Sequence, residues 1–331
     1  MARLWLRDRV TYLTGVIILS AILLAVTVYS CSENHSGPAL RVGTNVWPGY
    51  EPLYLARHLK LYDENLLYLV EYSSSSQVMR ALRNGVIDAA GLTLDEAILL
   101  KDLGLDMKIL AVMDISNGAD AIIAQSGIEA FSDLKHRKIG VENTALGALF
   151  LARALEEHGM TAADVEIVPL EIDEQFQAFV EHQIDAVVTF EPVLGKLLEL
   201  DGRRVFHSGQ IPGEIVDVLL INARYLNQAN QKRVNELLNS WYAALAYFNE
   251  QPEQSAKQIG RRLKLSTEQV LASYQGLILP DRKQNSDLLS HKEHKSKLLL
   301  TAEKLVEVMY ENHLIEHKVD ASSLFVSNQV E

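Results

Sequence analysis

Acidic, aromatic and hydroxyl side chains follow the ends of several predicted strands, and these residue types can hold a small polar molecule. Trp47 and Tyr50 flank a Pro-Gly turn, and Ser73–Ser76 precede a predicted helix. An aromatic ring offers a flat wall or a face for a cation, and a helix N-terminus offers amides and hydroxyls. The candidate ligand-binding residues are Trp47, Tyr50, Ser75, Ser76, Thr93, Asp95, Asp114, Asn117, Asn143, Thr144, Glu191 and Asp217.

Four of these candidates are carboxylates (Asp95, Asp114, Glu191 and Asp217), and none is an arginine or a lysine. The set therefore favours a ligand that is cationic, carries an amine or contains a heteroaromatic ring. Helix N-termini also bind anions without any basic side chain, so the acidic character alone does not decide the charge of the ligand.

The same residues also have ordinary structural interpretations. Trp47 and Tyr50 could pack against the next helix, while the serines and Asp95 could cap helix N-termini. Glu191 could be a first-turn acid that the helix dipole favours. Asp217 lies inside the apolar stretch "EIVDVLL", where a buried acid needs a partner. That partner could be a ligand amine or a hydrogen bond within a crossover between domains.

A short phrase occurs twice in the chain. Residues Ile87–Ala97 read "IDAAGLTLDEA", and residues Ile184–Val193 read "IDAVVTFEPV". Each copy predicts the end of a helix, a buried strand, and a polar loop with an acid that starts the next helix. Ligands of open α/β sheets bind beyond the carboxyl ends of strands, so we expect both copies to point into one cleft.

The elements around these residues alternate between strand and helix patterns. Predicted strands cover 40–47, 67–73, 86–92 and 107–113 in a first half, and 120–125, 136–142, 165–171 and 184–190 in a second. The run 214–222 predicts a strand that returns to the first sheet. Helical patterns follow at 228–249, 251–263, from Ser266 onward and at 295–312. This order is typical of mostly parallel α/β sheets.

The first thirty residues form a separate segment. A basic start precedes the uncharged stretch Val10–Ser30, which predicts an export signal. The only cysteine of the chain, Cys31, ends this stretch in "VYSC", which resembles a bacterial lipobox. We therefore expect a lipoprotein signal peptide at 1–30, lipidation of Cys31 and a tether at 31–39. The alternative is an uncleaved membrane anchor behind which the cysteine falls by chance.

The composition disfavours two other classes of function. A net charge of −12, with no basic patch beyond short pairs such as Arg261-Arg262, argues against nucleic-acid binding. The chain has no nucleophile elbow, no P-loop and no HExxH pattern, and its only cysteine is Cys31. We therefore expect no enzyme activity, no metal and no cofactor.

Five stretches together resemble the solute-binding proteins of ABC importers, in the branch that binds nitrate, sulfonates, taurine and thiamine-pyrimidine precursors. They are "GTNVWPGYEPLYLAR" (43–57), "ALRNGVIDAAGLTLDEA" (81–97), "DLKHRKIGVE" (133–142), "IDAVVTFEP" (184–192) and "IPGEIVDVLLIN" (211–222). The resemblance implies a two-lobed type II periplasmic binding-protein fold with two hinge crossovers and a helical C-terminal region. It places lobe 1 at 40–119 plus 218–331 and lobe 2 at 120–217.

The same resemblance implies a function and partners. The lobes would close around a small-molecule ligand and present it to an ABC permease, from a monomer held at the membrane by lipid on Cys31. Two alternatives stay open. One is a binding protein that signals to a membrane receptor. The other is an enzyme of the thiamine-pyrimidine synthesis type, whose cysteine-rich motif this chain lacks.

Overall fold

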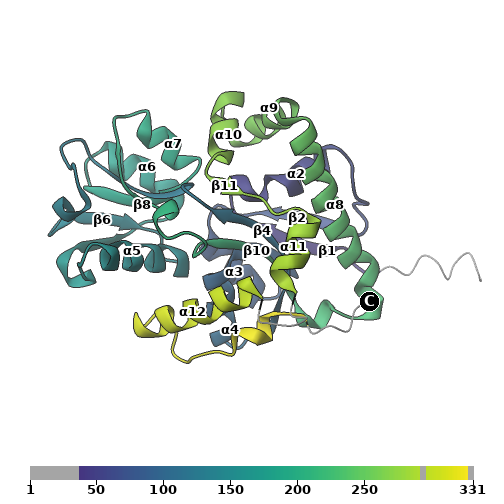
Figure 1. Ribbon diagram of the computed structural model, residues 1–331. Helices are drawn as coiled ribbons and strands as arrows, with labels where there is room; N and C mark the ends of the chain where they lie inside the picture. The colour runs from purple at the N-terminus through teal and green to yellow at the C-terminus, as the bar shows by residue number, and fades with distance from the viewer. Residues whose placement is uncertain (1–36, 291–295, 327–331) are drawn as a thin grey trace, which may run out of the picture. The chain divides into compact units, whose positions relative to one another are not determined.

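Two β-sheets flanked by helices form the body of the protein. The computed structural model describes residues 37–290 and 296–326, so the predicted signal peptide, Cys31 and most of the predicted tether lie outside the described residues. Among the helices of the described part, none combines the length and apolar character needed to cross a membrane. Figure 1 shows the two sheets and their helices.

The first sheet has six strands in the order β11-β4-β10-β3-β1-β2. Its strands are β1 (Leu40–Thr44), β2 (Leu67–Glu71), β3 (Ala89–Thr93), β4 (Met107–Ser116), β10 (Val216–Asn222) and β11 (Leu277–Ile278). Strand β1 pairs in parallel with β2 and β3, whereas β10 runs antiparallel between β3 and β4. Helices α2 (Glu51–His58), α3 (Ser75–Arg83) and α4 (Leu94–Asp102) connect the first four strands.

The second sheet has five strands in the order β7-β6-β8-β5-β9. Its strands are β5 (Asp120–Ala124), β6 (Lys138–Val141), β7 (Glu166–Pro169), β8 (Ala186–Phe190) and β9 (Arg203–His207). Helices α5 (Ala145–Glu157), α6 (Ile172–Val180) and α7 (Val193–Leu198) lie between them in the chain. The C-terminal helices are α8 (Gln231–Glu250), α9 (Pro252–Leu263), α10 (Thr267–Tyr274), α11 (Arg282–Leu289) and α12 (Lys297–Glu311).

Alternation along the strands divides each core into two layers, because successive side chains point to opposite faces of a sheet. In β10, Leu219 and Ile221 pack with α2 and α8–α10, whereas Val218 and Leu220 pack with α3, α4 and α12. The second sheet has α5 on one face and α6 with α7 on the other (Figure 1). Both sheets are therefore covered on both faces, which explains their nearly continuous apolar strands.

The chain passes from the first sheet to the second between β4 and β5, and it returns between β9 and β10. The two connections are joined by side chains. The hydroxyl oxygens of Ser116 and Ser208 lie 2.7 Å apart, and the amide of Gly118 donates to Ser208 Oγ at 2.6 Å. The predicted fold class, with two α/β lobes and two crossovers, is confirmed. The exact lobe boundaries stay a prediction.

Several element boundaries differ from the sequence prediction. Strand β4 continues to Ser116, so Asp114 lies inside the strand and not in the loop after it. Helix α7 begins at Val193, with Pro192 at the N-cap position and not in the first turn. Two of the C-terminal helices are shorter than predicted, since α8 begins at Gln231 and α12 covers Lys297–Glu311.

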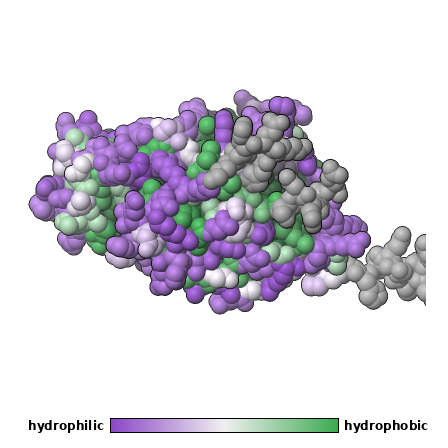
Figure 2. Space-filling view, turned by 60° about the horizontal axis from the view of Figure 1, so that its bottom comes forward, coloured by the Kyte–Doolittle hydropathy of each residue, from purple (hydrophilic) through white to green (hydrophobic). Residues whose placement is uncertain are grey.

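The surface is mixed in character. Figure 2 shows one face on which hydrophilic residues predominate and hydrophobic residues appear between them. Large exposed apolar side chains such as Tyr68, Val86 and Leu300 come from different elements. Isolated apolar residues of this kind are ordinary and do not mark a docking surface. The expected monomer therefore stays a prediction.

A single amide side chain completes the outer edge of β4. Strand β11 pairs only with Ile115 and Ser116, so it does not reach Val112. Asn285 of α11 fills this place, because its Oδ1 accepts from the Val112 amide at 2.6 Å and its Nδ2 donates to the Val112 carbonyl at 2.9 Å. The buried Asn285 side chain thus replaces one residue of a neighbouring strand.

We expect Asn285→Ala to lower the free energy of unfolding by about 2–4 kcal/mol, because two buried backbone groups lose their partners. Urea unfolding followed by circular dichroism would measure the loss. Asn235→Ala, at an exposed position of α8, is the matched control and should change stability by less than about 0.5 kcal/mol. Equal effects of the two substitutions would contradict the role of Asn285.

Candidate functional site

Three polar residues lie in one row across the centre of the first sheet. Asp217 of β10 pairs with Thr93 of β3 on one side and with Asp114 of β4 on the other. All three residues are buried. Asp217 lies more than 100 residues after the other two in the sequence. The antiparallel insertion of β10 therefore sets two carboxylates directly opposite each other, an arrangement that electrostatic repulsion disfavours while both are ionised.

The turn after β1 supplies two aromatic donors to these carboxylates. The hydroxyl of Tyr50 donates to Asp217, and the indole Nε1 of Trp47 donates to Asp114 Oδ2 at 3.1 Å. Gly49 lies between the two aromatics, where a Cβ atom would stand only 1.8 Å from Asp114 Oδ2. Glycine is therefore required in "WPGY" because the backbone approaches the carboxylate closely.

A small cavity lies beside this row at the junction of the two lobes. Its volume is about 10 Å³, which is enough for about one water molecule. Its lining is Asn45, Trp47, Tyr50, Ser75, Thr93, Asp120, Leu146, Phe190 and Asp217. Leu146 and Phe190 come from the second lobe, and the Trp47 and Phe190 rings meet edge to face at 5.4 Å. The lobes are thus closely packed against each other here.

The N-terminus of α3 contacts carboxylates of the second lobe. Ser76 Oγ donates to the carboxylate of Glu171 at 3.1 Å, and Glu142 lies close enough to the backbone amide of Ser75 for that amide to oppose the rise in its pKa. A helix N-terminus is a favourable place for an anion. In this closed arrangement the protein places its own carboxylates there.

Burial changes the protonation of the acids at this junction. Desolvation raises the pKa of Asp114 to about 7 and the pKa of Asp120 to about 7. Burial also raises the pKa of Glu142 to about 7, and the nearby charge of Glu171 adds to this shift. The pKa of Asp217 is raised well above its usual value, first by burial and then by the charge of Asp114.

A second buried acid pair begins helix α4. Burial raises the pKa of Asp95 to about 6. Burial and the charge of Asp95 raise the pKa of Glu96 well above its usual value. Glu96 accepts from the Thr93 amide at 3.1 Å, which is a helix-capping contact. Both oxygens of Asp95 are buried and lack a hydrogen-bond partner among the described residues.

The structure brings together only part of the predicted ligand-binding set. The cavity is lined by five of them: Trp47, Tyr50, Ser75, Thr93 and Asp217. Asp114 does not line it but accepts a hydrogen bond from Trp47, which does. Ser76 and Asp95 lie nearby without lining it.

The remaining predicted residues lie elsewhere. Asn117 is exposed in the first crossover, where its amide donates to the Gly276 carbonyl. Asn143 and Thr144 line a separate hollow of about 260 Å³, and Thr144 caps α5 by accepting from the Gly147 amide. Glu191 is half-buried, precedes the N-cap of α7 and accepts from the Gly195 amide at 3.1 Å, so it caps the helix N-terminus from outside the first turn.

Sequence reasoning missed several residues of the site. Glu96, Glu142 and Glu171 were not among the candidates, although "TLDE" (93–96) already has the spacing of a capping box. No local pattern indicates that Glu142 and Glu171 meet α3, because their contacts cross between lobes. Asp120 was not among the candidates either, and it lines the cavity while its backbone amide donates to Ser116 Oγ at 3.2 Å.

We expect the free energy of unfolding of the ligand-free protein to fall as the pH rises from about 5 to about 8. Carboxyls such as Asp114 stay protonated in the folded protein up to pH of about 7, whereas they lose the proton near pH 4 when unfolded. Raised folded-state pKa values therefore give stability that is lost on raising the pH, by about 1.4 kcal/mol per unit for one fully titrating group.

Urea unfolding at pH 5, 6, 7 and 8 would test this dependence. Asp114→Asn should flatten it, because asparagine keeps an acceptor for Trp47 without a titrating proton. Asp287→Asn on exposed α11 should leave the slope as in the wild type. If the stability of the wild type rises with pH over this interval, the buried carboxyls do not have the raised pKa values described above.

Comparisons with known proteins agree with this fold. Residues 47–255 match the family model described as NMT1/THI5 like. An Escherichia coli K12 protein named as an aliphatic sulfonates-binding protein is 25% identical over 304 residues, covering 90% of this chain and 92% of the relative.

Two solved structures share the architecture. The alkanesulfonate-binding protein SsuA of Xanthomonas axonopodis pv. citri, bound to MOPS, has a TM-score of 0.73 at 18% identity, covering 88% of this chain and 99% of that one. The periplasmic aliphatic sulphonate binding protein SsuA of Escherichia coli has a TM-score of 0.70 at 21% identity, covering 88% and 98%. Because the family model matches more than half of the chain, this protein belongs to the NMT1/THI5-like family.

Proposed function

We propose that this protein is the extracytoplasmic solute-binding component of an ABC importer, exported by its N-terminal segment and held at the membrane by lipid on Cys31. Family membership and relatives named for solute binding support this role. In the proposed cycle the lobes open, a small ligand enters between them, and closure presents it to a permease.

We further propose that the ligand carries an amine or another cationic group. The observation that carries this proposal is the set of buried acids at the lobe junction. No ion pair with an arginine, lysine or histidine of the described residues reaches Asp95, Asp114, Asp120 or Asp217. A cation entering such a buried site would offset the cost of ionising these carboxyls.

Aromatic groups at the same place support a cationic ligand. Trp47, Tyr50 and Phe190 line the cavity together with Asp217. An ammonium group is attracted both to a carboxylate and to the face of an aromatic ring. An anion at the N-terminus of α3 would be repelled, because Glu171 already accepts from Ser76 there and Glu142 lies beside it.

Ligand entry requires the lobes to move apart. A cavity of about 10 Å³ is far below the volume of roughly 300 Å³ or more that small-molecule sites need. The crossovers at 117–119 and 208–215 are the connections about which the lobes could rotate. The Ser116–Ser208 hydrogen bond joins these connections and would steady the hinge.

Two other functions receive less support. Synthesis of a thiamine pyrimidine would need the cysteine-rich motif of that enzyme type, and Cys31 is the only cysteine in this chain. A binding protein that signals to a membrane receptor would use the same closure, so a permease and an ATPase encoded beside this protein would favour transport.

Thermal unfolding of the purified protein against a ligand panel would test the proposal. The panel contains polyamines, simple alkylamines, thiamine-pyrimidine precursors, taurine, alkanesulfonates and nitrate. We expect an amine-bearing compound to raise the melting temperature, since a ligand at one hundred times its dissociation constant adds about 2.7 kcal/mol to the folded state.

The variants Asp217→Asn and Asp114→Asn should lower the affinity for that ligand at least tenfold. Asp287→Asn, at an exposed position of α11, should bind it as the wild type does. A shift with alkanesulfonates alone would retain the binding-protein role and overturn the cationic ligand. Failure of every compound to bind would count against solute binding by this cleft.

A further inference from the structure

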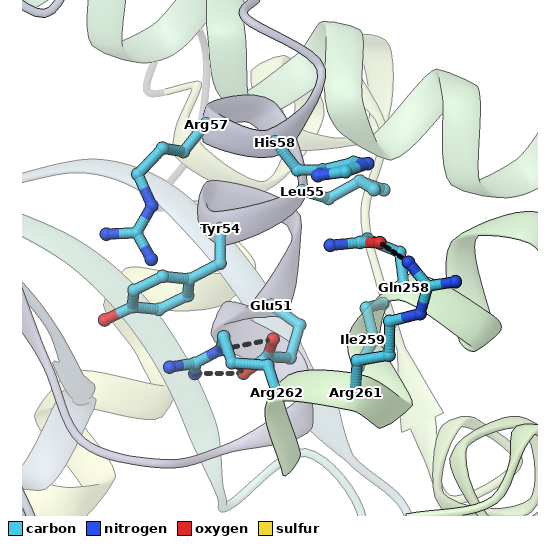
Figure 3. A pocket seen from close by; sticks show the side chains of 9 residues that line it. All are labelled: Glu51, Tyr54, Leu55, Arg57, His58, Gln258, Ile259, Arg261 and Arg262. Carbon is cyan, nitrogen blue, oxygen red and sulfur yellow. Dashed lines mark hydrogen bonds and ion pairs between the residues drawn. The ribbon is translucent and has the colours of Figure 1, made fainter. Parts of the chain in front are cut away.

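Another hollow lies between helices α2 and α9, and it shares no residue with the cavity at the lobe junction. Its volume is about 360 Å³. Figure 3 shows its lining, which includes Arg57, His58, Arg261 and Arg262 but only one carboxylate, that of Glu51. This excess of positive charge stands out in a chain whose net charge is −12.

Arg262 is held in place and neutralised by its own partners. Its Nε donates to Glu51 Oε2 at 2.8 Å, and its guanidinium also pairs with Glu71. The same guanidinium lies 3.6 Å from the ring centroid of Tyr54. Glu51 is fully buried, so this ion pair forms part of the wall. Removing either partner would leave a buried charge unpaired.

The basic groups on the other side of the hollow, His58 and Arg261, form no ion pair with an acid in the part of the chain that the structure describes. Arg261 is exposed, and among the described residues its guanidinium hydrogen-bonds to Gln258, with Nη1 donating to Oε1 at 3.4 Å (Figure 3). His58 is exposed and forms no hydrogen bond or ion pair within the described residues. Because Gln258 uses its oxygen towards Arg261, its NH2 group stays available as a donor.

These groups stand where two hollows meet. A neighbouring hollow of about 210 Å³ shares Leu55, His58, Gln258 and Arg261 with the first and adds Lys257 to the lining. Helices α2 and α9 therefore present an imidazole, an amide, a guanidinium and an ammonium group where the two hollows meet. Each of them can donate a hydrogen bond, and a guanidinium matches a tetrahedral oxyanion in a two-pronged geometry.

We propose that the place where the two hollows meet is a second binding site, separate from the cavity between the lobes. It holds the phosphate group of a small molecule between His58, Gln258 and Arg261. Lys257 adds positive charge from the neighbouring hollow. The larger hollow, with Arg57 on its far side in Figure 3, leaves space for the rest of a phosphate ester. This site has the opposite charge preference from the acidic cavity, so the two would take different ligands.

Isothermal titration with inorganic phosphate, at constant ionic strength, would test the site on the whole protein. We expect saturable binding with one site per chain. A second titration with glycerol phosphate distinguishes the two sources of the phosphate group. Tighter binding of the ester would identify a small organic phosphate, and equal binding would identify free phosphate.

The double variant Lys257→Gln/Arg261→Gln should weaken binding at least tenfold. Both side chains are exposed on α9, so the fold should be kept, which thermal unfolding would verify. Arg80→Gln/Arg83→Gln on α3 removes the same charge elsewhere and should bind as the wild type does. Absence of saturable binding, or equal weakening in both variants, would overturn the proposal, since the latter indicates only a general attraction of anions.

Discussion

The burial of Asp114 beside Asp217 is the constraint on which the rest of the site depends. Strand β10 brings the two carboxyls into register, and their pKa values rise because burial disfavours the charged forms. The aromatic donors Trp47 and Tyr50 satisfy one oxygen of each. This arrangement is costly to ionise without a counter-charge, so it makes the junction responsive both to pH and to a cationic ligand.

Packing between the lobes depends on the same region. Trp47 contacts Phe190 across the junction, and α3 receives Glu142 and Glu171 from the second lobe. The protein's own side chains thus fill most of the space at the junction, and Glu171 accepts from Ser76 at the N-terminus of α3. A ligand must replace these contacts. Its affinity therefore reflects the difference in free energy between the lobes closed on the ligand and the lobes closed on each other.

Helix α2 connects the two charged regions of the first lobe. Tyr50 precedes it and donates to Asp217 at the acidic junction, while Glu51 begins it and pairs with Arg262 beside the basic hollow. The consecutive residues Tyr50 and Glu51 therefore point to opposite sides, Tyr50 towards Asp217 and Glu51 towards Arg262. The separation keeps the carboxylates of the cavity away from the guanidinium groups, which would otherwise neutralise them.

The sequence by itself determined the alternation of strands and helices, the strand at 214–222 and the aromatic turn at 47–50, because periodicity and turn residues are local. It also identified Asp114 and Asp217 as candidates. Only the tertiary structure decided that these acids face each other, that Glu142 and Glu171 meet α3, and that Asn117 and Asn143 are exposed. Strand register and lobe contacts join residues far apart in the chain, and no local pattern encodes such pairings.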